Sequence, residues 1–167
     1  MFDFNERGIW LIGNLNYIII YALCYVVLNE IRKINEVRIY INSIGGNIFE
    51  GLIAYDVNQF SKFDIRTICL KQASSLSSLM LASGTIGKRL CLKHASLFVH
   101  QPNVTIVNGL STLMNGLVNI NYIGENIIKI YIRHCDKNYF EVIRILLDSI
   151  WMSSNFAIRW AIIDNLV

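Results

Sequence analysis

Short apolar runs alternate with segments of helical periodicity along most of the chain. Residues 36–42 (EVRIYIN) are rich in β-branched side chains, and residues 48–60 follow with apolar side chains at helical spacing. This alternation predicts an α/β fold of βα units around a parallel sheet. We also predict strands over residues 9–12, 64–70, 88–92 and 97–100, and helices over residues 17–32, 75–84, 110–134, 139–147 and 155–160.

The longest helical pattern, residues 110–134, exceeds what a small compact domain needs. Gly116 and Gly124 interrupt the pattern, but isolated glycines do not forbid a helix. We expect this helix to protrude from the domain and to pack against a partner.

Residues 9–28 are apolar and nearly long enough to span a membrane. Gly13, Asn14 and Asn16 interrupt the stretch, and no basic cluster precedes it. A strand, a turn over residues 13–16 and a buried helix from Tyr17 account for the pattern better than a membrane span or a signal peptide.

Composition points to subunit interfaces. Of the 167 residues, 54% are hydrophobic and only 16% are charged, which is a high apolar content for a monomer. We therefore expect one domain over residues 1–167 with large apolar interfaces.

Lys and Arg are scattered at a net charge of +3, which argues against nucleic-acid binding. The four cysteines form no CxxC pair, so we expect reduced core residues, with no disulfide or metal role.

Three short segments combine glycine, serine and histidine where predicted strands end. Residues 41–47 (INSIGGN) carry two glycines whose amides could face an oxyanion, although an ordinary turn has the same pattern. Residues 72–80 (QASSLSSLM) start a helix with serines, which act there as nucleophiles or as N-caps, and Ser74 suits the cap. In residues 98–102 (FVHQP), His100 fits a catalytic base or a structural histidine.

In order and spacing these segments resemble the ClpP family, the proteolytic subunits of the ATP-dependent Clp protease. That family has its oxyanion glycines in NSPGG, its nucleophile in QAASMG and its base in HQP. The corresponding stretches here are residues 42–46, 72–77 and 100–102, and the resemblance extends from about residue 6 to residue 164. It implies that Ser75 is the nucleophile, His100 its general base, and the backbone amides of Gly46 and Leu76 the oxyanion hole.

The resemblance also implies a crotonase-like subunit in two stacked heptameric rings, in which helix 110–134 is the handle between rings. Unfolded proteins would be the substrates, and a Clp-family AAA+ ATPase the partner, with Tyr40 in the cleft that receives it. ATP would be used by that partner, and the chain itself would need no cofactor.

The third member of the triad departs from the family. Counting back from Met152 and Ser153 puts Ser149 at the family's aspartate position, and Asp148 is one residue earlier. Either Asp148 reaches His100 after a local shift, or the orienting carboxylate is missing, which lowers rates in serine proteases by roughly 10⁴-fold.

Two functions follow from the resemblance: an active serine endopeptidase, or a weak or inactive ClpR-like structural subunit of a mixed ring. Ser75 and His100 favour the first, whereas Ser149 and the short segment before the first strand favour the second. An acyl-CoA enzyme of the crotonase fold would not need the serine–histidine pair. Frequent Ile and Asn beside a single Pro indicate AT-rich coding, so we expect a plastid location, or the cytoplasm of a reduced bacterium.

Overall fold

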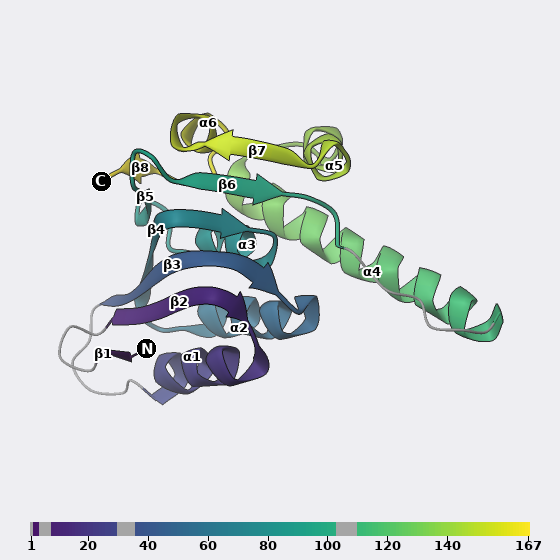
Figure 1. Cartoon of the computed structure of the whole chain (residues 1–167), viewed down its shortest axis with the longest axis horizontal. Coiled ribbons are helices and arrows are strands. Elements are labelled where there is room, and N and C mark those ends of the chain that lie inside the picture. Colours follow the sequence, from purple (N-terminus) through teal and green to yellow (C-terminus); the bar gives the residue numbers. More distant parts are fainter. Residues whose placement is uncertain (1, 4–7, 30–35, 103–109) are drawn as a thin grey trace.

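The computed structural model describes residues 2–3, 8–29, 36–102 and 110–167, with side chains for residues 8–29, 36–102 and 120–167. Its strands form one sheet in the order β1-β2-β3-β4-β5-β8, and β6 pairs with both β4 and β7 (Figure 1). All pairs are parallel except β1–β2 and β6–β7, which confirms the α/β prediction. The strands are β1 (Phe2–Asp3), β2 (Gly8–Leu15), β3 (Glu36–Gly46), β4 (Asp64–Ser74), β5 (Arg89–Cys91), β6 (Ser96–Val99), β7 (Ile150–Ser153) and β8 (Asn165–Leu166).

Six helices accompany these strands in the described ranges, close to the predicted positions. Each capped end has a local cause: Asn47 Oδ1 accepts the Phe49 amide at 2.9 Å, and Asn138 forms a capping box with Glu141. The helices are α1 (Tyr17–Asn29), α2 (Ile48–Phe60), α3 (Leu76–Ala82), α4 (Leu110–Cys135), α5 (Tyr139–Asp148) and α6 (Ser154–Arg159).

Helix α4 projects well beyond the sheet, as the sequence predicted (Figure 1). Its C-terminal part packs on the domain, where Ile123, Ile127 and Tyr131 are buried. No helix in the described part of the chain is long and apolar enough to cross a membrane.

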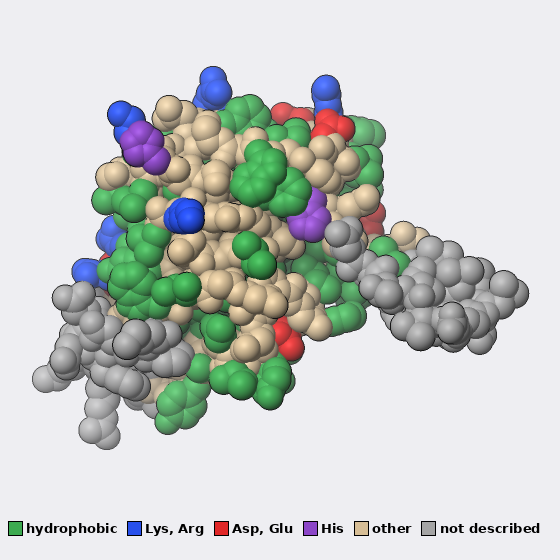
Figure 2. All heavy atoms as spheres, viewed as in Figure 1, with side chains coloured by type: hydrophobic (Ala, Val, Ile, Leu, Met, Phe, Trp, Pro, Cys, Tyr) green, Lys and Arg blue, Asp and Glu red, His purple; other side chains and the backbone are tan. Residues whose placement is uncertain are grey.

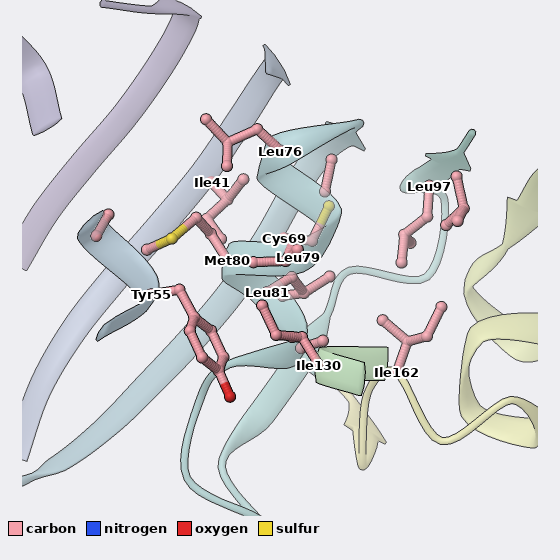
Figure 3. Close-up of a cluster of buried hydrophobic side chains, with 14 of the residues drawn as sticks. Ile41, Tyr55, Cys69, Leu76, Leu79, Met80, Leu81, Leu97, Ile130 and Ile162 are labelled. Carbon is pink, nitrogen blue, oxygen red and sulfur yellow. The ribbon is translucent and has the colours of Figure 1, made fainter. Parts of the chain in front are cut away.

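The core lies between the sheet and α3, a helix with every residue buried. Figure 3 shows Leu76, Leu79 and Met80 of α3 in one apolar cluster with Ile41 and Leu97. All four cysteines are buried and free, which confirms their predicted place in the core. The core therefore holds α3, and the turn that precedes it, rigidly against β3, β4 and β6.

One sequence prediction about the strands was wrong, and some short strands were missed. Residues 13–16 do not form a turn: β2 continues to Leu15, because its pairing with β3 resumes after a register shift at Gly13 and Asn14. The Ser43 hydroxyl supports this bulge by donating to the Gly13 carbonyl at 2.6 Å. The short strands β1, β7 and β8 were not predicted, and of these β7 pairs antiparallel with β6. The predicted end of the helix at residue 32 lies outside the described residues.

His134 is buried beneath α2, where its Nε2 lies 3.0 Å from the Tyr55 hydroxyl. Burial, together with the charges of Arg89 and Arg133, lowers the pKa of His134 to about 4. In the unfolded chain His134 takes up a proton near pH 6.5, whereas in the folded chain it does so only near pH 4. The folded state therefore loses stability as the pH falls from 6.5 towards 4.

We expect the free energy of unfolding to fall by about 2 kcal/mol between pH 7 and pH 5 through this one group. Chemical denaturation at fixed protein concentration measures it. The H134Q variant should lose most of this pH dependence, and H94Q, at an exposed histidine, should keep it. Equal pH dependence in H134Q and the unmodified chain would contradict the assignment.

Candidate active site

Ser75 occupies the single-residue turn between β4 and α3 with φ 54° and ψ −124°. A positive φ at a non-glycine residue costs on the order of 1–3 kcal/mol and persists only where the surroundings impose it. The main restraint is the Ser75 amide, which donates to the carbonyl of Phe98 on β6 at 2.8 Å. Although Ser75 is the N-cap residue of α3, its side chain makes no capping hydrogen bond. Its hydroxyl is thus left for another role.

The neighbouring serines are less suited to react. Ser74, Ser77 and Ser78 are buried, whereas Ser75 is half-buried. Ser74 ends β4, so the prediction that it caps the helix was wrong, and its hydroxyl accepts from Gln72 at 2.6 Å. Ser78 donates to the Ser75 carbonyl at 2.6 Å and lies 2.8 Å from the hydroxyl of Tyr131.

The glycine turn at the end of β3 lies against the serine turn. Gly45 has φ +100°, and a Cβ there would lie 2.8 Å from the Ser74 carbonyl oxygen and 3.3 Å from the Leu76 nitrogen. The Ser43 hydroxyl fixes the turn by accepting the Gly45 amide at 3.0 Å. Gly46 approaches the Leu15 carbonyl so closely that a side chain would collide with it. The fold thus brings the Gly45–Gly46 backbone and Leu76 to the same place as Ser75.

His100 follows β6 directly, and it lines a small cavity that Ser75 also lines. The cavity has a volume of about 20 Å³. Its other walls are apolar apart from a tyrosine: Ile48, Leu76, Leu79, Pro102, Ile127 and Tyr131. Burial raises the pKa of Tyr131, so its hydroxyl stays protonated and available to Ser78.

The structure does not bring Asp148 to His100. Asp148 is the last residue of α5, its side chain is 53% exposed, and its carboxylate lies 3.6 Å from Nε of Arg144. Ser149 ends the helix in the left-handed region with φ 53°. The antiparallel pairing of β6 with β7 ends at Val99 and Ile150. Beyond it the Gln101 amide donates to the Leu146 carbonyl at 3.0 Å, so the β6–β7 register does not extend to His100. Among the described residues no carboxylate forms a hydrogen bond with His100.

An aromatic side chain lies against His100 instead. The rings of Phe98 and His100 are stacked, with centroids 4.9 Å apart, and the other neighbour of Phe98 is Trp151 at 4.8 Å. Sequence reasoning missed both aromatic residues. The spacing of Phe98 and His100, two apart on a strand, could have revealed the first contact, but Trp151 depends on the unforeseen β7.

Within the part of the chain that the structure describes, no group of three or more His, Cys, Asp or Glu side chains is arranged to hold a metal ion.

A serine on a strained strand-to-helix turn, with a glycine turn and a histidine beside it, is typical of enzymes that use a serine nucleophile. Comparison with known families narrows this class. The family model described as Clp protease matches residues 4–167, so the chain belongs to the Clp protease family. Its fold is accordingly the ClpP fold, with α4 as the projecting helix.

Proposed function

We propose that the chain is a proteolytic subunit of an ATP-dependent Clp protease and hydrolyses peptide bonds with Ser75 and His100. The observation that carries this proposal is the half-buried hydroxyl of Ser75, which makes no capping hydrogen bond, on a strained turn in the same small cavity as His100. Strain of this kind is kept at functional sites because the rest of the structure compensates for it.

In the proposed reaction the Ser75 oxygen attacks the scissile carbonyl carbon while the His100 imidazole takes the hydroxyl proton. The carbonyl oxygen becomes an oxyanion, and the amides of Gly46 and Leu76 donate to it. Collapse of the intermediate breaks the peptide C–N bond, and His100 returns the proton to the leaving amine. A water molecule then attacks the acyl-enzyme, His100 again acting as base, and the carboxylic acid product leaves with Ser75 restored. Asp148 could orient His100 only if its side chain left Arg144.

The second candidate function is a ClpR-like structural subunit of a mixed ring. It is favoured by Ser149 at the family's aspartate position and by the Asp148 carboxylate, which lies 3.6 Å from Nε of Arg144, so that no described carboxylate bonds to His100. In that case the cavity lined by Ser75 and His100 would be present but would hydrolyse no peptide bonds, and neighbouring subunits would cut the substrate.

Assembly into stacked rings is supported by apolar surface that the subunit leaves uncovered. Tyr21 and Tyr25 of α1 are 58% and 69% exposed, and Phe60 of α2 is 72% exposed. Figure 2 shows apolar side chains along the edge where α1 lies in Figure 1. We propose that related or identical subunits cover this surface and that α4 joins the two rings. Obligate interfaces are apolar in this way.

The proposed partner is a Clp-family AAA+ ATPase, which would use ATP to deliver unfolded polypeptides. Tyr40, the expected contact residue, is stacked on Trp10 with ring centroids 4.5 Å apart. This places a half-buried aromatic pair on β2 and β3, suited to hold an apolar side chain of a partner. A plastid location remains part of the proposal, on the AT-rich coding alone.

The test is turnover by the assembled ring, isolated with its partner subunits. Hydrolysis of a short fluorogenic peptide, and of an unfolded protein when the ATPase and ATP are added, is expected for the active subunit. The control is the same ring with S75A in this subunit. Equal hydrolysis by both rings would overturn the peptidase proposal and leave the structural role.

A further inference from the structure

Phe98 connects the two residues of the proposed reaction. Its carbonyl accepts the Ser75 amide at 2.8 Å, which holds the strained turn in place. Its ring lies against the His100 imidazole, with centroids 4.9 Å apart and planes 24° apart. One residue therefore restrains the backbone of the nucleophile and the ring of the base.

The fold explains why these rings meet. Phe98 and His100 are two residues apart at the end of β6, so their side chains leave the same face of the strand. Phe98 is paired in register with Trp151 of β7, and cross-strand partners lie close enough for aromatic rings to stack. The Phe98 and Trp151 rings are 4.8 Å apart with planes 27° apart. The result is a stack of three rings, with Phe98 in the middle and His100 at one end.

A general base must keep its ring oriented towards the nucleophile, and a buried carboxylate usually does this. Here no described carboxylate bonds to His100, and the Asp148 carboxylate lies 3.6 Å from Nε of Arg144. The stack offers another restraint, because a ring packed face to face cannot rotate without losing that contact. It also favours the imidazolium that forms during reaction, since a cation over an aromatic face is stabilised by the ring quadrupole.

We propose that Phe98, backed by Trp151, is a positioning residue that orients the His100 imidazole by stacking. The inference rests on the proposed peptidase function for its effect on rate, but the orientation of the ring can be measured without any turnover. Phe98 does not touch the reacting atoms in this account, since it acts through His100 and through the Ser75 amide.

The first test measures the rate at which a fluorophosphonate labels Ser75 in the assembled protein. We expect F98L to label about tenfold more slowly, because it keeps an apolar side chain but removes the aromatic face. F98Y, which restores that face, should recover most of the rate, and W151L should give a smaller loss than F98L. The matched control is F156L, an aromatic-to-aliphatic change on α6 at a partly buried position away from His100.

The second test is the proton resonance of the His100 ring in protein labelled with ¹³C-histidine, assigned with H100Q. The Phe98 ring current displaces this resonance, so F98L should shift it, whereas F98Y and F156L should leave it near its original position. The displacement itself reports the contact between the rings. A single sharp His100 resonance in the unmodified chain and in F98Y, replaced in F98L by a broadened or doubled one, reports the loss of a fixed ring orientation.

These measurements distinguish failure of the positioning role of Phe98 from failure of the proposed peptidase function. Labelling of F98L at the unmodified rate would overturn the positioning role. If the unmodified ring is not labelled at all, the peptidase function fails, and the resonance alone then decides the orientation. A His100 resonance that does not move in F98L would overturn the positioning role in that case also.

Discussion

Replacing Ser75 with alanine is expected to abolish fluorophosphonate labelling and to lower peptide hydrolysis on the order of 10⁶-fold, as loss of the nucleophile does in serine proteases. Labelling is read by mass spectrometry of the tryptic peptide 72–88, which contains all four clustered serines. Fragmentation of that peptide assigns the adduct to one residue.

The matched variants are S74A and S77A on either side of the turn. Both hydroxyls are buried, and that of Ser77 has no hydrogen-bond partner within the described residues. Removing a hydroxyl without a partner costs little stability, so S77A should fold and label as the unmodified chain does. Labelling that survives in S75A and disappears in S74A or S77A would move the nucleophile to another residue.

The second large effect is expected at Gly45. In G45A the new Cβ would lie 2.8 Å from the Ser74 carbonyl oxygen and 3.0 Å from the Ser75 Cβ, both part of the rigid turn. The glycine turn must move away from Ser75, and the proposed oxyanion donor, the Gly46 amide, moves with it. Removing one such donor costs about 10²–10³-fold in rate, so we expect labelling of Ser75 to slow by at least about 100-fold.

G87A is the control for backbone strain. Gly87 has φ +85°, close to the +100° of Gly45, but a Cβ there meets nothing within 4 Å. Both variants bear the strain of an L-residue at positive φ, which lowers stability by roughly 1–3 kcal/mol, and only G45A disturbs the site. Thermal unfolding measures the shared loss, and labelling rates measure the difference. Equal labelling rates in the two variants would contradict the role of the glycine turn.

Local signals in the sequence predicted much of the fold. The helix over residues 48–60 was predicted to the residue, because Asn47 caps its start and the strands on both sides are strongly apolar. The motif spacing also predicted that Ser75, His100 and the glycine turn would come together, since parallel strands present their carboxyl ends at one edge of the sheet.

Features that depend on pairing between distant segments could not be predicted in this way. The extension of β2 to Leu15 requires a bulge at Ile44 of β3, and β7 exists because Ile150 pairs with Val99, far away in the sequence. The stack of Trp151 on Phe98 follows from that pairing. The unusual φ of Ser75 likewise results from a hydrogen bond to another strand.

The most direct test of the account is an experimental structure of the assembled ring after reaction with a fluorophosphonate. We predict phosphorus bonded to the oxygen of Ser75, a phosphoryl oxygen accepting from the amides of Gly46 and Leu76, and an imidazole nitrogen of His100 within hydrogen-bond distance of the adduct. An adduct on a different residue, or a His100 ring turned away from Ser75 with the two amides bonded elsewhere, would contradict it.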